Sequence, residues 1–220
     1  MSSFNVSPEM RKMLSEKDRM MVLHDLALID ADEEPVFDRL TRLASKIVGT
    51  PMSMLSMVGG DYQFFKSAYG VDYRSTPLSH AFCKHVVVDD APLVVDDARV
   101  HPELYDNGSV TDHNVAGYLG FPVKMANGKT LGSFCVVDNK PHHWTELDFE
   151  IMRELTEIVK YEIEVRALVH AGSMTQAELD ALHGEIFTFA DRISTDQPKK
   201  AIAAQIREER LTVFGEWQSA

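Results

Sequence analysis

Apolar residues recur at intervals of three and four in two segments near the start of the chain, which is the spacing of one face of an α-helix. In residues 35–49 the pattern is bounded by Pro35, at a first-turn position, and by Gly49, a common helix terminator. A weaker pattern follows Ser15, a residue type that favours the N-cap, and it predicts a helix over about 15–29. The apolar positions of the two segments are Val22, Leu23, Leu26 and Ile29, and Val36, Phe37, Leu40, Leu43, Ala44 and Ile47.

The period then changes to that of β-strands. Two short apolar and aromatic runs, 52–58 and 62–69, flank Gly59-Gly60-Asp61 and predict a hairpin. Residues 115–124 and 130–138 flank Asn127-Gly128, a strong short-range hairpin signal. With a brief strand at 93–95, these runs predict an antiparallel sheet.

Between the hairpins, residues 77–87 have the pattern of a short helix, and residues 96–115 form a long polar loop with turn residues at Pro102, Asn107 and Gly108. Long loops of this kind often carry binding groups. We therefore expect ligand contacts in the 96–115 segment.

Helical patterns return after Trp144. Thr145 and Asp148 form a capping-box arrangement before a helix over about 145–168, and further helices are predicted over 175–193 and 198–214. The 175–193 helix carries a narrow apolar seam of Leu179, Leu182, Ile186, Phe189 and Ile193. This seam must be buried, either in a homodimer or against the first helix of the same chain.

The pattern divides the chain into an N-terminal tail (1–19), a central domain (20–170) and a C-terminal helical extension (171–220). A formal net charge of -12 disfavours nucleic acid and anionic membrane surfaces as partners. No apolar run approaches the roughly 20 residues of a membrane span, and the N-terminus lacks a signal-peptide pattern. Two cysteines without metal or disulfide spacing suit a reducing cytoplasm, where we expect the protein.

The stretch HAFCKHVVVDDAPLVVDDA, residues 80–98, concentrates ionisable and nucleophilic side chains. Cys83 lies near His80, Lys84 and His85, cations that could lower the pKa of a reactive thiol, yet a packed cysteine among apolar neighbours is the more common arrangement. His80 and His85 are five residues apart and diverge on a helix, so no metal site is expected. The stretch is best interpreted as the rim of a binding pocket.

Four ordered segments resemble the GAF domain family, a group of small-molecule-binding modules of signalling proteins: FDRLTRLASKIVGTPMSMLSMVGGDYQFFKSAYGV, PLSHAFCKHVVVDDAPLVVDDARVHPEL, GFPVKMANGKTLGSFCVVDNKP and WTELDFEIMRELTEIVKYEIE. The resemblance implies an α+β fold related to PAS domains: a six-stranded antiparallel sheet backed on one face by the N- and C-terminal helices, with a pocket on the other. It also implies a pocket roof formed by residues 79–88 and 96–115. The implied ligand-binding residues are Ser56, Phe65, Tyr118, Phe121 and Cys135 on the sheet, Phe82 and Cys83 in the roof, and Asp97, Arg99 and His101 in the loop.

The family pattern is not matched for two known ligand classes. Covalent bilin is not expected, because Cys83 is followed by Lys84 and Cys135 by Val136 where bilin-binding relatives commonly have histidine. A cyclic nucleotide is not inferred, because Trp144 replaces the signature phenylalanine and Asp148 is followed by Phe149. No cofactor is identified.

The resemblance predicts a non-catalytic sensor or regulatory protein that binds an unidentified small molecule non-covalently and acts through its terminal helices, on itself as a homodimer or on a downstream signalling protein. Two alternatives remain open. One is a thiol-dependent redox enzyme centred on Cys83, as in GAF-fold reductases of free methionine sulfoxide. The other is a dimerisation scaffold without ligand.

Overall fold

The computed structural model describes residues 6–215. Its centre is a six-stranded sheet in the order β3(Ser75–Pro77), β2(Tyr62–Tyr69), β1(Met52–Val58), β6(Thr130–Asp138), β5(Gly117–Lys124) and β4(Leu93–Val95). All neighbouring strands are antiparallel. The predicted α+β class and six-stranded sheet are confirmed.

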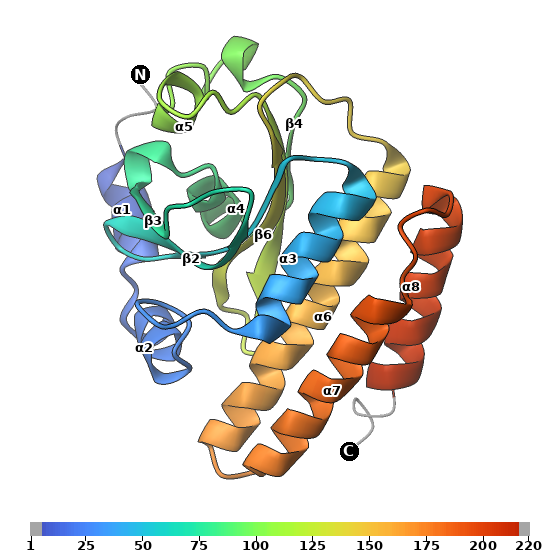
Figure 1. Cartoon of the computed structure of the whole chain (residues 1–220). Coiled ribbons are helices and arrows are strands. Elements are labelled where there is room, and N and C mark those ends of the chain that lie inside the picture. The colour runs from blue at the N-terminus through green and yellow to red at the C-terminus, as the bar shows by residue number, and fades with distance from the viewer. Residues whose placement is uncertain (1–5, 216–220) are drawn as a thin grey trace.

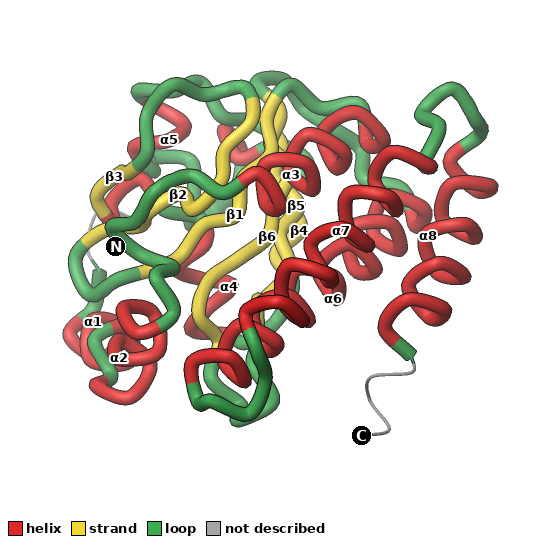
Figure 2. The backbone as a smooth tube through the Cα atoms, turned by 60° about the horizontal axis from the view of Figure 1, so that its bottom comes forward, coloured by secondary structure: helices red, strands yellow, loops and turns green. Residues whose placement is uncertain are grey.

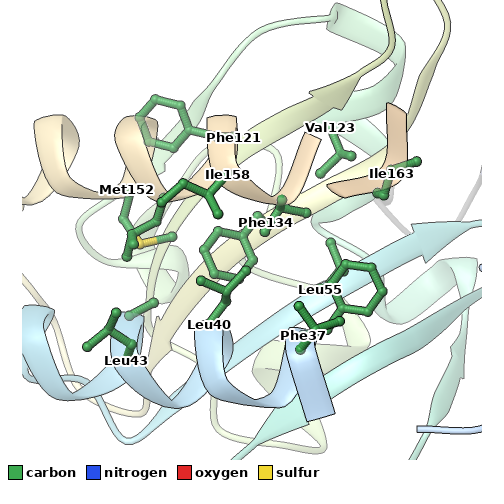
Figure 3. Close-up of a cluster of buried hydrophobic side chains, with 14 of the residues drawn as sticks. Phe37, Leu40, Leu43, Leu55, Phe121, Val123, Phe134, Met152, Ile158 and Ile163 are labelled. Atoms are coloured by element: carbon green, nitrogen blue, oxygen red, sulfur yellow. The ribbon is translucent and has the colours of Figure 1, made fainter. Parts of the chain in front are cut away.

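On one face of this sheet, α7(Gln176–Arg192) and α8(Lys199–Phe214) form an outer layer over α3(Pro35–Val48) and α6(Glu146–His170), which lie directly on the strands (Figure 1). Their apolar stripes meet the sheet in a core that includes Phe37, Leu40, Phe134 and Ile158, shown in Figure 3. The opposite face is covered by α1(Pro8–Leu14), α4(Cys83–Asp89) and α5(Gly108–Thr111), while α2(Lys17–Asp25) lies near the lower end of the sheet (Figures 1 and 2).

The two predicted hairpins are confirmed, since β1 pairs with β2 and β5 with β6 across the predicted turns. The capping box at Thr145 and Asp148 is also present at the start of α6. The interpretation of 77–87 was only partly right. Ser75–Pro77 pairs with β2 as β3, a 3₁₀ turn follows at Leu78–His80, and α4 begins only at Cys83.

The N-terminal region differs from the predicted tail and single helix. Ser15 ends α1 instead of starting a helix, and the carboxylate of Glu16 caps α2 by accepting hydrogen bonds from the amides of Asp18 and Arg19. Leu14 is fully buried in the core below α4, and the guanidinium of Arg19 donates to the carbonyls of neighbouring segments. The segment therefore forms part of the folded domain.

The apolar seam of α7 packs inside the same chain, against α3 and α6. All five seam residues are buried, among them Leu182 at 4% exposure and Ile186 at 0%. The helix α8 covers the outer side of α6, where Lys199 donates to Asp148 and to the carbonyl of Val48. The surface expected to form the homodimer contact is therefore covered within one chain. The homodimer itself stays a prediction.

Candidate functional site

A second hydrophobic cluster lies on the sheet face opposite the long helices, and it encloses a small cavity. The cavity has a free volume of about 30 Å³, room for a few atoms, and it is bounded by strands below and by the segments 73–83 and 109–115 above. Its lining residues are Met52, Met54, Gln63, Phe65, Tyr73, Thr76, His80, Phe82, Cys83, Ser109, Val115, Tyr118 and Val137. Among these described lining residues there is no lysine, arginine or carboxylate side chain, and His80 is the one basic residue.

The floor of the cavity depends on a glycine. Tyr118 and Gly120 project from β5 toward the cavity, and a Cβ at Gly120 would overlap the Tyr118 hydroxyl. The phenol can therefore lie along the strand, where its oxygen is 3.3 Å from the Cys83 sulfur and 3.1 Å from the Ser133 hydroxyl. The Phe82 ring packs edge-on against the Tyr118 ring, with 5.3 Å between centroids.

One wall is a buried chain of polar side chains. Ser56 donates to the amide oxygen of Gln63 (3.1 Å), and the Gln63 nitrogen donates to the Thr76 hydroxyl (2.7 Å). All three residues are buried, so these bonds compensate for their lost hydration. The wall presents an amide and a hydroxyl to a molecule in the cavity.

The roof is a row of rings in contact, one pair of them stacked and two pairs tilted. Tyr73 lies between Phe65 and His113, at centroid distances of 5.8 and 4.8 Å, and His113 is followed by His80 at 5.6 Å. The imidazole of His80 is held by Ser79 and Asp112 at 2.9 and 3.0 Å. Three loops of different sequence position thus meet over the cavity.

His80 can occupy this position because α5 begins with Gly108. A Cβ on that residue would overlap three atoms of the imidazole ring. Ser109 adds a hydrogen bond from its hydroxyl to the His80 carbonyl, 2.5 Å long, so the start of α5 is fixed on top of the histidine. The conformation of the roof therefore depends on contacts between residues that are far apart in the sequence.

The two cysteines belong to the same buried cluster and interact with each other. A hydrogen bond from the Cys135 thiol, together with the hydroxyls of Ser56 and Tyr118, outweighs burial and lowers the pKa of Cys83 to about 7. Its bond to Cys83 raises the pKa of Cys135 well above the usual range, and burial adds to this effect. Both are free thiols.

The structure brings together part of the predicted site. Phe65, Phe82, Cys83 and Tyr118 line the cavity. Ser56 and Cys135 lie on the same face of the sheet, directly behind the lining: Ser56 supports Gln63, and Cys135 belongs to the cluster that encloses the cavity. Their contact with a ligand stays a prediction.

Phe121 requires a correction, because it points to the other side of the sheet. Its ring packs against Phe149 of α6 with a centroid distance of 4.6 Å, and Figure 3 shows it beside that helix. Side chains alternate along a strand, so a residue three positions after Tyr118 must face the opposite way. Phe121 belongs to the helix-side core.

Asp97, Arg99 and His101 lie outside the cavity lining. The guanidinium of Arg99 binds both carboxylate oxygens of Asp97 at 2.8 Å, and the His101 ring accepts a hydrogen bond from the amide of Glu103. These contacts are local and solvent-facing. They stabilise a turn, and they do not place the three side chains over the sheet.

Several lining residues were not predicted, and one signal could have revealed some of them. Gln63 is two residues before Phe65 in the same strand, so alternation places both on the cavity face. Thr76 lies in β3, whose three residues and proline give too weak a strand pattern to detect. Tyr73, His80 and Ser109 come together only through tertiary contacts.

Two features of residues 6–215 bear on the class of site. No group of three or more His, Cys, Asp or Glu side chains in that range could hold a metal ion. Within the same residues, no helix combines the length and apolar character needed to cross a membrane.

An antiparallel sheet with long helices on one face and short helices and loops on the other is the architecture of a sensory α+β domain. A family comparison agrees with this class: the GAF domain model matches residues 32–163. The chain belongs to the GAF domain family.

One curated protein is similar to this chain in sequence. A cyclic di-GMP phosphodiesterase of Pseudomonas aeruginosa is 28% identical over 150 residues, which are 67% of this chain and 26% of that protein. The chain thus spans about a quarter of the length of this curated relative.

Solved structures share the fold at low identity. The GAF domain of a phosphoenolpyruvate-protein phosphotransferase from Coxiella burnetii has a TM-score of 0.52 at 16% identity, covering 72% of this chain and 100% of that one. The free methionine-R-sulfoxide reductase of Neisseria meningitidis, solved with its substrate, has a TM-score of 0.51 at 14% identity, covering 77% and 98%.

Proposed function

We propose that this chain is a non-catalytic sensory module that binds a small molecule non-covalently between the sheet and the aromatic roof. The observation that supports this most directly is the cavity, because it combines an aromatic roof, a buried polar wall and a glycine-dependent floor. Buried polar groups next to an apolar hollow are the usual composition of ligand pockets.

The lining favours an uncharged ligand with an aromatic or apolar body. Lysine, arginine and carboxylate side chains are missing from the described residues that line the cavity, so a phosphate or carboxylate would be buried without a counter-charge. Gln63, Thr76 and Ser109 offer hydrogen bonds, and Tyr73, Phe82 and Tyr118 offer ring faces. The free volume of about 30 Å³ is much smaller than a typical ligand pocket, so binding requires the roof to move outward.

We infer that the signal reaches the helices through the sheet. In β6, Cys135 and Val137 belong to the cavity-side cluster, and Phe134 and Val136 belong to the helix-side core. A ligand that shifts this strand therefore changes the surface on which α3 and α6 pack. Such coupling requires two arrangements of the helices, which a second copy or a downstream signalling protein would distinguish.

Thermal unfolding in the presence of uncharged aromatic heterocycles, with free purine and pyrimidine bases as the first probes, tests the proposal. A compound that binds the folded state raises the melting temperature, and the rise grows with the logarithm of the ratio of its free concentration to Kd. Gln63→Ala should abolish the shift in melting temperature, and Arg99→Ala should preserve it. Gln63 lines the cavity, whereas Arg99 does not. If every probe fails and cavity variants leave the melting temperature of the free protein unchanged, the pocket proposal is wrong.

A thiol-dependent reductase is the second candidate, and one observation favours it. Cys83 lines the cavity, and hydrogen bonds from Cys135, Ser56 and Tyr118 lower its pKa, which favours the reactive thiolate. Formation of methionine from free methionine sulfoxide, with dithiothreitol as reductant, tests this activity. Turnover that disappears in Cys83→Ser would establish the enzyme, and no turnover by the intact protein would exclude it.

A further inference from the structure

The fold brings the two cysteines of the sequence into one buried cluster. Cys83 is the first residue of α4, and Cys135 lies in the middle of β6, so a helix and a strand that are distant in sequence supply the two thiols. The helix α4 packs directly on β6. The proximity is therefore set by the packing of the cavity wall on the sheet.

The contacts around Tyr118 show how the thiols meet. Cys135 is paired across the sheet with Gly120, which has no side chain, and the Tyr118 hydroxyl occupies the space above that glycine. The same hydroxyl contacts the Cys83 sulfur at 3.3 Å. Both sulfurs consequently face one phenol oxygen, and they also interact directly with each other.

The two thiols have different protonation. Cys83 is the one stabilised as thiolate by surrounding donors, while Cys135 keeps its proton. Because the thiolate is the nucleophile, Cys83 is suited to react first and Cys135 to react with the product.

The two thiols also differ in how accessible they are from the cavity, and Cys83 is again the one suited to react first. Cys83 lines the cavity, whereas Cys135 is fully buried and lies outside the lining. A free volume of about 30 Å³ admits a reagent of the size of hydrogen peroxide, since a site of about 10–15 Å³ by this measure already holds a water.

We propose that Cys83 and Cys135 form an intramolecular disulfide when the protein meets a hydroperoxide, so that the cavity is also a peroxide-responsive site. The Cys83 sulfur attacks the outer peroxide oxygen. An S–O bond forms, the O–O bond breaks, and the leaving oxygen takes up one proton, equal to the one that the Cys83 thiol released on becoming a thiolate, to give water or an alcohol. The Cys135 sulfur then attacks the sulfenic sulfur, the S–S bond forms, and the hydroxyl leaves as water with the Cys135 proton.

In sum, two thiols and one hydroperoxide give one disulfide, one alcohol or water, and one further water. The bond links α4, which forms one wall of the cavity, covalently to the central strand β6. It also removes the thiol that contacts Tyr118. Oxidation is therefore expected to change the cavity, whether or not a ligand enters it.

Peptide mapping of the full chain after treatment with hydrogen peroxide tests the proposal. The expected product has lost two hydrogen atoms and contains the Cys83 peptide linked to the Cys135 peptide within one chain. In Cys135→Ser, Cys83 should instead accumulate as a sulfenic acid that dimedone captures. In Cys83→Ser, Cys135 should remain a thiol.

A urea-unfolded sample is the control, because it contains the same thiols without their arrangement. There the difference between the two cysteines should disappear, and each should react at the rate of an ordinary thiol. The proposal is overturned if both thiols of the folded protein stay free, if the linkage joins two chains, or if Cys83 gives the same product with and without Cys135. The wild-type result decides the question even if a variant fails to fold.

Discussion

The phenol of Tyr118 lies over Gly120, and this overlap allows one hydroxyl to contact Cys83 and Ser133 at the floor of the cavity. Residues two apart on a strand project to the same face, so the side chain of the first normally meets that of the second. Here the second residue is Gly120, which has no side chain. The geometry of the site thus depends on the absence of a single methyl group.

Gly120→Ala should consequently displace the phenol and destabilise the fold. Overpacking of a buried site costs about 1–3 kcal/mol, and this loss in the free energy of unfolding should be measurable by urea denaturation. Gly184→Ala is the matched control, because Gly184 is exposed on α7 and an added Cβ meets nothing within 4 Å. That variant should be more stable than the wild type by about 0.5–1 kcal/mol.

A partly buried chain of charges joins the helix layer to Lys66 of β2, and its central member is Arg166. This guanidinium binds Glu34 at 2.8 and 2.5 Å and Glu162 at 2.7 Å, and Glu162 is fully buried. Arg166→Met would leave both carboxylates without their main partner and should cost about 3–5 kcal/mol in chemical denaturation. Arg11→Ala, which breaks the exposed pair with Asp61, should cost less than about 1 kcal/mol. Equal effects of the two variants would contradict this interpretation.

Glu34 should make the fold sensitive to acid. Burial alone would raise its pKa, but hydrogen bonds from Arg166 and Lys66 outweigh burial and lower the pKa to about 2. A carboxyl whose pKa is depressed in the folded state stabilises the fold above its unfolded pKa, and this contribution is lost as the pH falls from about 4.5 toward 2. The stability gap between the wild type and Glu34→Gln should therefore narrow over this range, by on the order of 2–3 kcal/mol. A gap that does not change with pH would show that Glu34 is not the group responsible.

The seam of α7 provides a test of its intramolecular role. Leu182 is buried against the helix layer, so Leu182→Ala should cost about 2–5 kcal/mol by urea denaturation. Glu185→Ala, on the exposed side of the same helix, should change stability by no more than about 0.5 kcal/mol. Light scattering of both variants should give the mass of the wild type. A loss of mass in Leu182→Ala alone would show that the seam also mediates association.

The parts of the fold that were predictable from sequence are those with local causes. Asn127-Gly128 determines a tight turn and Thr145 with Asp148 caps α6, because each effect involves residues within a few positions of one another. Strand β3 was missed because three residues that include Pro77 carry almost no periodic signal.

The site was harder to predict because its geometry is non-local. Ring contacts between Tyr73, His113 and His80 join three loops, and no spacing in the sequence indicates them. The resemblance implies a ligand contact for Arg99 in the long loop, yet Asp97 lies two residues away and binds its guanidinium. Phe121 is different: strand alternation with Tyr118 already excluded it from the cavity face.

Cys83 should titrate near neutral pH. The Cys135 thiol and the neighbouring hydroxyls of Ser56 and Tyr118 lower its pKa to about 7 despite burial, so about half should be thiolate at pH 7, against a few per cent for an ordinary cysteine. Ultraviolet absorbance of the thiolate, with Cys83→Ser as the baseline, measures this directly and needs no reagent to enter the cavity.

Tyr118→Phe keeps the ring and removes one donor, so the titration midpoint of Cys83 should move upward. Tyr105→Phe makes the same chemical change at a tyrosine that is 56% exposed, and it should leave the midpoint unchanged. A Cys83 midpoint near that of a free thiol in the folded wild type would mean that the surrounding donors do not compensate for burial. Because local donors act only at short range, a midpoint near 7 that rises in Tyr118→Phe alone would establish that the phenol and the thiol form one functional unit.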